Sequence, residues 1–227
     1  MYLWNQAVKA SLEPLANAKN AKTMKSYMRD HFEFYGIQST LRRIAIKPLF
    51  TKLQLPQIDL TPNIAEELWT LPEREYQLVA VDLLIKQNMG LDFTMLPVLE
   101  RLIVTKSWWD TVDFLSSHIT GALFLNYPEE TSEYIVRWRQ SENIWLRRTV
   151  ILFQLKFKQH TETSLLFEII RENQTNAEFF IQKAIGWALR EYSKTDPIAV
   201  RNFIHQQNIQ GLAKRESLKW LHCHNLE

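Results

Sequence analysis

The 227-residue chain has little glycine, a single cysteine and no long hydrophobic run. Its five glycines stand too far apart to form the GxGxxG or GxxxxGK[ST] loops that bind nucleotide phosphates. Tight β-hairpins also depend on glycine, so the composition disfavours an all-β fold. Cys223 has no second cysteine with which to form an internal disulfide, which is typical of proteins in a reducing compartment.

Segments that would target the chain to a membrane are missing as well. No stretch approaches the roughly 18 apolar residues of a membrane-spanning helix, and the N-terminus lacks the basic and apolar regions of a secretory signal. The sequence therefore predicts a soluble, cytoplasmic protein without a membrane partner. The formal net charge of +2 is too small to indicate nucleic-acid binding by itself, so the placement of the cations matters more than their number.

Apolar residues recur at intervals of 35 along the chain. Two of the resulting columns are Ile64, Leu99, Tyr134, Ile169, Ile204 and Ala45, Ala80, Leu115, Val150, Ile185, the second continuing to Trp220. A third, Leu49, Leu84, Ile119, Gln154 and Leu189, has one polar member. Columns about half a period apart indicate two helices per repeat, each with one buried face. The sequence predicts an all-α fold, a right-handed α-solenoid of about six HEAT-like helix pairs with a concave surface, forming a single domain over residues 1–227.

Several large or charged side chains fall outside the predicted buried faces. In a helix expected around 107–120, Trp109 and Asp113 share a face next to the apolar stripe. In the helices expected around 143–158 and 177–193, the residues turned away from the core are Arg148, Lys156, Lys183, Trp187 and Arg190. An indole among cations is typical of a surface that binds a phosphate-bearing partner, because the cations contact phosphate while the ring packs on sugar or base.

The 35-residue register places three cations, one acid and one apolar residue along one ridge of the predicted solenoid, namely Arg43, Leu78, Asp113, Arg148 and Lys183. More conventional interpretations of these residues stay open. Trp109 could pack beneath a neighbouring repeat, Trp187 could cover the aliphatic parts of Lys and Arg side chains, and Asp113 could form a salt bridge with Arg148 in the adjacent repeat.

Two motifs, KSWWDTVD at 106–113 and FFIQKAIGWALREY at 179–192, together with NIWLRRTVILFQLKFKQ at 143–159, carry a family resemblance. The chain closely resembles the AlkD type of DNA alkylation-repair glycosylase, a family of HEAT-like repeats. The resemblance implies removal of N3- and N7-alkylated purines, such as 3-methyladenine and 7-methylguanine, from double-stranded DNA bound on the concave surface, as a step of base excision repair.

The resemblance also assigns roles to residues of this chain. It implies that Asp113 is the catalytic acidic residue. Trp109 and Trp187 are implied to lie beside the lesion, and Arg148 on the phosphate side. Further DNA-binding positions expected along the groove are Tyr27, Gln38, Arg43, Lys156, Lys183 and Arg190. The lesion would be captured through its backbone, without a closed base-binding pocket.

The resemblance implies that alkylated double-stranded DNA is the partner. No obligate protein partner is expected, and a monomer is expected because a solenoid capped by polar end helices can be monomeric. No cofactor or metal is expected, since the histidines lack HExxH spacing and the group His222, Cys223 and His224 is a weak motif at the chain end. Because helical solenoids also serve as adaptors, the alternative is a non-catalytic module that binds damaged DNA or acts as a protein scaffold.

Overall fold

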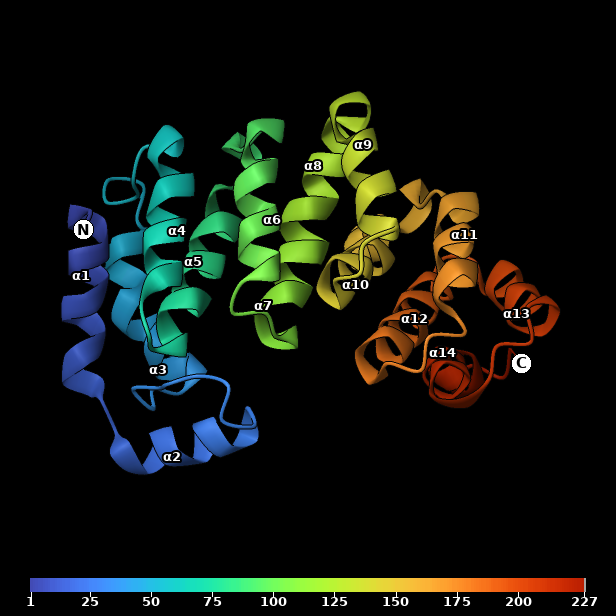
Figure 1. Ribbon diagram of the computed structural model, residues 1–227, viewed down its shortest axis with the longest axis horizontal. Coiled ribbons are helices and arrows are strands. Elements are labelled where there is room, and N and C mark those ends of the chain that lie inside the picture. The colour runs from blue at the N-terminus through green and yellow to red at the C-terminus, as the bar shows by residue number, and fades with distance from the viewer. Residues whose placement is uncertain (227) are drawn as a thin grey trace. The chain divides into compact units, whose positions relative to one another are not determined.

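The computed structural model describes residues 1–226 and is helical throughout, with no β-strand in that range (Figure 1). The α-helices are α1 (Leu3–Leu12), α2 (Ala18–Tyr27), α3 (Ser39–Ile46), α4 (Thr61–Thr70), α5 (Arg74–Gln87), α6 (Leu96–Val104), α7 (Trp109–Phe114), α8 (Gly121–Asn126), α9 (Pro128–Arg139), α10 (Ile144–Leu152), α11 (Thr163–Asn173), α12 (Phe179–Tyr192), α13 (Pro197–Gln206) and α14 (Gly211–Cys223). The shorter 3-10 segments are η1 (Glu13–Leu15), η2 (Lys47–Phe50), η3 (Ile58–Leu60), η4 (Asn88–Gly90), η5 (Phe93–Met95), η7 (Phe153–Lys156) and η8 (Lys158–His160), and η6 (Leu115–Thr120) is a π-helix. The predicted all-α helical-repeat fold is confirmed.

The chain forms two compact units, Met1–Val98 and Leu99–Glu227. In a repeat array most contacts join neighbouring repeats, so such a division does not require separate domains. The single repeat domain, and the right-handed, concave form of the whole array, stay predictions. Among residues 1–226, no helix combines the length and the apolar character that crossing a bilayer requires.

The first unit is built on α1, α3, α4 and α5, which pack on one another (Figure 1). The loop between α2 and α3 is tied to this stack by Glu75, a fully buried residue of α5. Its carboxylate accepts hydrogen bonds from the backbone N–H groups of Tyr35, Gly36 and Ile37, at 3.2, 2.9 and 3.0 Å. Gly36 has φ +87°, and a Cβ there would lie 2.2 Å from a backbone oxygen, so the loop needs glycine at this position.

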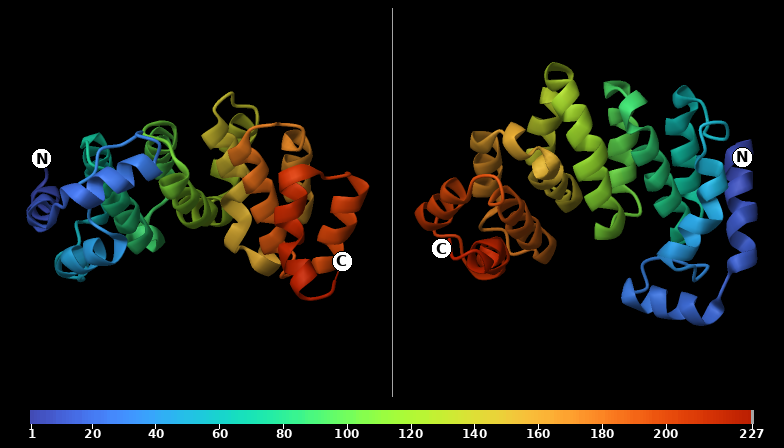
Figure 2. Two further views of the ribbon diagram at one scale, coloured as in Figure 1. Left: turned by 90° about the horizontal axis from the view of Figure 1, so that it is seen from below. Right: turned by 180° about the vertical axis from the view of Figure 1, so that it is seen from behind.

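In the second unit α12 packs against α10 and against α14, and the yellow, orange and red ribbons of Figure 2 show this succession. Most members of the apolar columns lie in the core, whereas Ala45, Leu49, Tyr134 and Trp220 are half-buried. Leu115, Val150 and Ile185 are fully buried, as are Leu99 and Ile169. The polar member of the third column, Gln154, is 4% exposed and is accommodated because its side-chain oxygen accepts the backbone N–H of Glu162 at 2.7 Å.

Two of the expected helices differ from a regular α-helix. The helix expected around 107–120 begins at Trp109 and continues to Asn126, but residues 115–120 are π-helical. The helix expected around 143–158 is α-helical to Leu152 and tightens into 3-10 turns beyond it. The buried stripes expected on these two helices nevertheless hold, because every member is at most 9% exposed. The members are Trp108, Val112, Leu115 and Ile119 on the first helix and Leu146, Val150, Phe153 and Phe157 on the second.

Candidate active site

An aromatic cluster joins the N-terminal ends of three helices in the second unit. The Phe180 ring on α12 lies 5.0 Å from the ring of Trp108, which precedes α7, and 5.0 Å from the ring of Trp145 on α10. The two tryptophan rings are 5.8 Å apart. Tilted and edge-to-face packing at these separations stabilises the pairs beyond their buried area, so the cluster holds α7, α10 and α12 in register.

Asp113 on α7 and Arg148 on α10 form a two-point salt bridge. Arg148 Nε donates to Asp113 Oδ1 at 2.7 Å, and Nη2 donates to Oδ2 at 2.9 Å. Arg148 Nη1 donates to the backbone carbonyl of Phe180, and the residue is 4% exposed. The inter-repeat salt bridge, one of the alternatives left open by the sequence, is therefore present, and it fixes the orientation of the Asp113 carboxylate.

The electrostatics of Asp113 are those of a sheltered carboxyl group. Its side chain is 13% exposed. Burial raises the pKa of Asp113 above its ordinary value, the guanidinium of Arg148 opposes this effect, and the nearby Asp110 adds to it. The charged form thus depends on its arginine partner.

The π-helical segment begins at Leu115, two residues after Asp113. In this stretch the hydroxyl of Ser116 donates to the backbone oxygen of Val112 at 2.6 Å, and that of Ser117 donates to the backbone oxygen of Asp113 at 2.7 Å. Such side-chain bonds to the preceding turn bend helices, and π-helical turns occur frequently at functional sites. Here the irregular turn lies immediately C-terminal to the candidate catalytic carboxylate.

A cavity of about 270 Å³ opens over this salt bridge. Its walls combine aromatic rings with charged groups, from Trp109, Asp113, Arg148, Phe179, Phe180, Lys183, Trp187, Arg190 and Glu216. Trp109 and Trp187 are both half-buried, so each indole is partly in the core and partly available to the cavity. The structure thus brings together six of the residues singled out in the sequence, namely Trp109, Asp113, Arg148, Lys183, Trp187 and Arg190.

The cationic side of the cavity is held by one acid of α14. Glu216 Oε1 lies 3.0 Å from Lys183 Nζ, and Glu216 Oε2 lies 3.0 Å from Arg190 Nη1. Lys219 Nζ lies 2.8 Å from both carboxylate oxygens. The hydrogen bond from Lys219, followed by the contacts of Lys183, lowers the pKa of Glu216 to about 2 against the opposing effect of burial.

Four predicted DNA-binding residues do not line this cavity. Lys156 is exposed at the end of η7, where its charge adds to burial in lowering the pKa of His118. Tyr27, Gln38 and Arg43 belong to the first unit, and all three are exposed. Arg43 lines a separate cavity of about 290 Å³ there, with its guanidinium 3.6 Å from Asp82.

Phe179, Phe180 and Glu216 line the cavity without having been singled out individually. Both phenylalanines stand in the FFIQKAIGW motif, where they resemble ordinary core residues. Glu216 follows Lys183 by 33 positions rather than 35, so it lies off the register that connects Asp113 to Arg148 and Arg148 to Lys183. A search that allowed the repeat length to vary by two residues could have found it.

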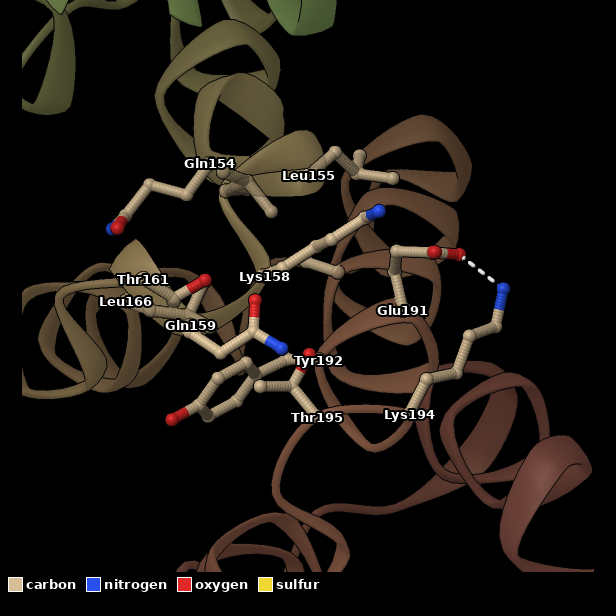
Figure 3. A pocket seen from close by; sticks show the side chains of 12 residues that line it. Gln154, Leu155, Lys158, Gln159, Thr161, Leu166, Glu191, Tyr192, Lys194 and Thr195 are labelled. Atoms are coloured by element: carbon tan, nitrogen blue, oxygen red, sulfur yellow. Dashed lines mark hydrogen bonds and ion pairs between the residues drawn. The ribbon is translucent and has the colours of Figure 1, made fainter. Parts of the chain in front are cut away.

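A second cavity of the same unit, about 200 Å³ in volume, lies between the C-terminal ends of α10 and α12 (Figure 3). Figure 3 shows Lys158 and Glu191 on its walls and the ion pair of Glu191 with Lys194, in which Nζ and Oε2 are 2.6 Å apart. None of the predicted catalytic or DNA-binding residues lines it.

Within residues 1–226, no group of three or more His, Cys, Asp or Glu side chains is arranged to hold a metal ion.

Comparison with known proteins identifies the family of the chain. A family model described as "DNA alkylation repair enzyme" matches residues 8–221. A solved structure described as a predicted DNA alkylation repair enzyme from Enterococcus faecalis is 33% identical, with a TM-score of 0.82, and the match covers 90% of this chain and 96% of that one. Among curated proteins, none matches the chain. Since the family model spans nearly all of the sequence, the chain belongs to the DNA alkylation repair enzyme family.

Proposed function

We propose that the protein is a DNA glycosylase that hydrolyses the N-glycosidic bond of N3- and N7-alkylated purines in double-stranded DNA. The observation that carries the proposal is the cavity in which the Asp113 carboxylate lies with two indoles and the cations of α12. Membership in a DNA alkylation repair family supports the same conclusion. A protein scaffold has no need to combine these groups in one hollow.

The proposed reaction requires mainly electrostatic stabilisation from the enzyme. An N3- or N7-alkylated purine already carries a positive charge, so it can leave as a neutral base without a general acid. The sugar then develops oxocarbenium character, which a carboxylate and the negative faces of aromatic rings stabilise. Asp113 supplies the carboxylate, and Trp109 and Trp187 supply the rings.

In this mechanism Asp113 stabilises the sugar cation and orients the attacking water. Specificity comes mainly from the lability of the charged bond, and the lesion is captured through its backbone rather than by a closed base pocket. Lys183 and Arg190, which are 39% and 30% exposed, are available to bind phosphates at the cavity rim.

Arg148 is a positioning residue in this proposal. Its Nε and Nη2 atoms are hydrogen-bonded to Asp113 and its Nη1 to Phe180, so its direct part in phosphate binding is secondary to holding the carboxylate. The same bond opposes the rise in the pKa of Asp113 that burial causes, and so favours the ionised carboxylate.

The test is release of free 7-methylguanine from methylated duplex DNA by the parent and by Asp113→Asn. Loss of one preorganised electrostatic group predicts a rate lower by about 10²–10³ at saturating enzyme. Asp59→Asn, which removes the same charge from an exposed position of the first unit, serves as control and should act at the parental rate. Thermal unfolding of each variant establishes that it is folded.

Three results would contradict the proposal. Asp113→Asn acting as fast as the parent would exclude the carboxylate from the chemistry. A parent protein that binds methylated duplex but releases no base would instead be a damage-binding module, and one that does not bind DNA would favour the scaffold.

A further inference from the structure

Three cations converge on the carboxylate of Glu216. Lys183 and Arg190 approach it from α12 and Lys219 from its own helix, all at 2.8 to 3.0 Å. Glu216 is 8% exposed. The group of four has a net charge of +2, since one acid opposes three bases, and it therefore keeps the capacity to bind an anion.

The approach of α14 that brings Glu216 into this position depends on Gly186. A Cβ at Gly186 would lie 2.3 Å from Glu216 Cβ and 3.0 Å from the backbone oxygen of Ala213. Gly186 is one residue from Trp187 and sits between Lys183 and Arg190 on the same helix. The absence of a side chain at Gly186 thus allows α12 and α14 to approach closely beside Lys183 and Arg190.

We propose that Glu216 is a positioning residue that holds Lys183 and Arg190, beside Trp187, in the arrangement that receives a phosphate of the DNA backbone. The inference rests on the proposed function because it takes duplex DNA as the ligand. Long cationic side chains lose conformational freedom when they bind, and side chains that are already held lose less of it. Lys219, which shares the carboxylate, belongs to the same phosphate site.

Positioning and simple attraction predict opposite effects for the removal of this acid. If Glu216 contributes only its negative charge, removing it strengthens the attraction between the cations and DNA, and the dissociation constant falls. If Glu216 positions the two cations, removing its charge frees them and the dissociation constant rises. The direction of the change therefore decides between the two roles.

The experiment measures the dissociation constant of Glu216→Gln for a non-methylated duplex at several salt concentrations. We expect binding about three- to tenfold weaker than that of the parent at each salt concentration, the range that corresponds to one ordinary hydrogen bond. Glu191→Gln is the matched control, because it also removes one acid from an ion pair near the end of α12 (Figure 3). It should bind as tightly as the parent or more tightly.

Gly186→Ala is a second variant that changes no charge. Its Cβ should displace α14 and weaken binding in the same direction, while thermal unfolding and helical content report whether the variant is folded. Weaker binding by folded Glu216→Gln supports the proposal whatever the fate of Gly186→Ala. Binding by Glu216→Gln that equals or exceeds that of the parent overturns it.

Base release measured on the same samples separates this inference from the proposed function. A parent that binds duplex without releasing 7-methylguanine would contradict the proposed glycosylase activity. The comparison of dissociation constants would still test whether Glu216 positions the two cations. Weaker binding limited to Glu191→Gln would contradict the positioning role while leaving base release by the parent unaffected.

Discussion

At the scale of single residues, the two acids of the candidate site differ in the cations that contact them. Asp113 and Arg148 are paired at two points, and Glu216 is surrounded by cations. Both acids are sheltered, yet burial dominates at Asp113, whereas hydrogen bonds from cations dominate at Glu216. The pKa of Asp113 is therefore raised and that of Glu216 is lowered. Perturbed carboxyl groups of this kind are common at functional sites.

Arg148→Gln should move the acid limb of the pH–rate profile. The guanidinium opposes the effect of burial, so its removal raises the pKa of Asp113 further. The active, ionised form is then lost at a higher pH as the solution is acidified. Single-turnover release of 7-methylguanine, measured at a series of pH values, checks this shift. The series runs from about pH 5 to about pH 8, the range in which folded proteins are usually most stable.

Arg147→Gln on the same helix is the control for this prediction, since Arg147 does not line the cavity. Its acid limb should coincide with that of the parent. A profile of Arg148→Gln that keeps the parental acid limb, in a protein that remains folded, would mean that Asp113 does not depend on Arg148 for its charge.

At the scale of elements, irregular segments set the positions of functional side chains. The π-helical turn after Asp113 and the close approach of α12 to α14 at Gly186 shape the candidate site. In the first unit, the loop between α2 and α3 is fixed by three hydrogen bonds, which its backbone N–H groups donate to the carboxylate of Glu75. This loop connects Tyr27 to Gln38, two of the proposed DNA-binding residues.

Glu75→Gln should loosen that loop. An amide has one accepting oxygen, so part of the charge-assisted bonding is lost in a fully buried position. The free energy of unfolding should fall by about 1.5–3 kcal/mol, the value typical of hydrogen bonds to a charged group. Urea unfolding measures this change, and hydrogen exchange should show faster exchange at the amides of Tyr35, Gly36 and Ile37.

Glu73→Gln, directly before α5, is the matched substitution, and it should leave exchange at these three amides unchanged. Equal exchange in Glu75→Gln and the parent would show that other contacts hold the loop.

At the scale of the whole molecule, proposed DNA-binding residues are distributed over both units. Arg43 and Lys183 are one example from each, at positions 140 residues apart, which is four repeats of 35. If both contact the same duplex, each neutralises its own phosphate and releases its own counterions.

Arg43→Met and Lys183→Met should each reduce the slope of log K against log salt by about one, and the double variant by about two. Distant, independent contacts are expected to add in this way. Lys52→Gln, an exposed cation of the first unit outside the predicted set, should leave the slope unchanged. A double variant with the slope of either single variant would show that only one of the two residues contacts DNA.

The sequence by itself determined the helical class, the buried columns and the membership of most of the site. A repeat of 35 residues fixes which faces are apolar, and the same count correctly connects Asp113 with Arg148, because equivalent positions in adjacent repeats lie side by side. Only the tertiary structure decided that Arg148 is buried and donates three hydrogen bonds, that residues 115–120 are π-helical, and that Glu216 lines the cavity. These features depend on how closely α12, α14 and α10 approach one another, and that spacing is set by side-chain packing, which a linear period does not encode.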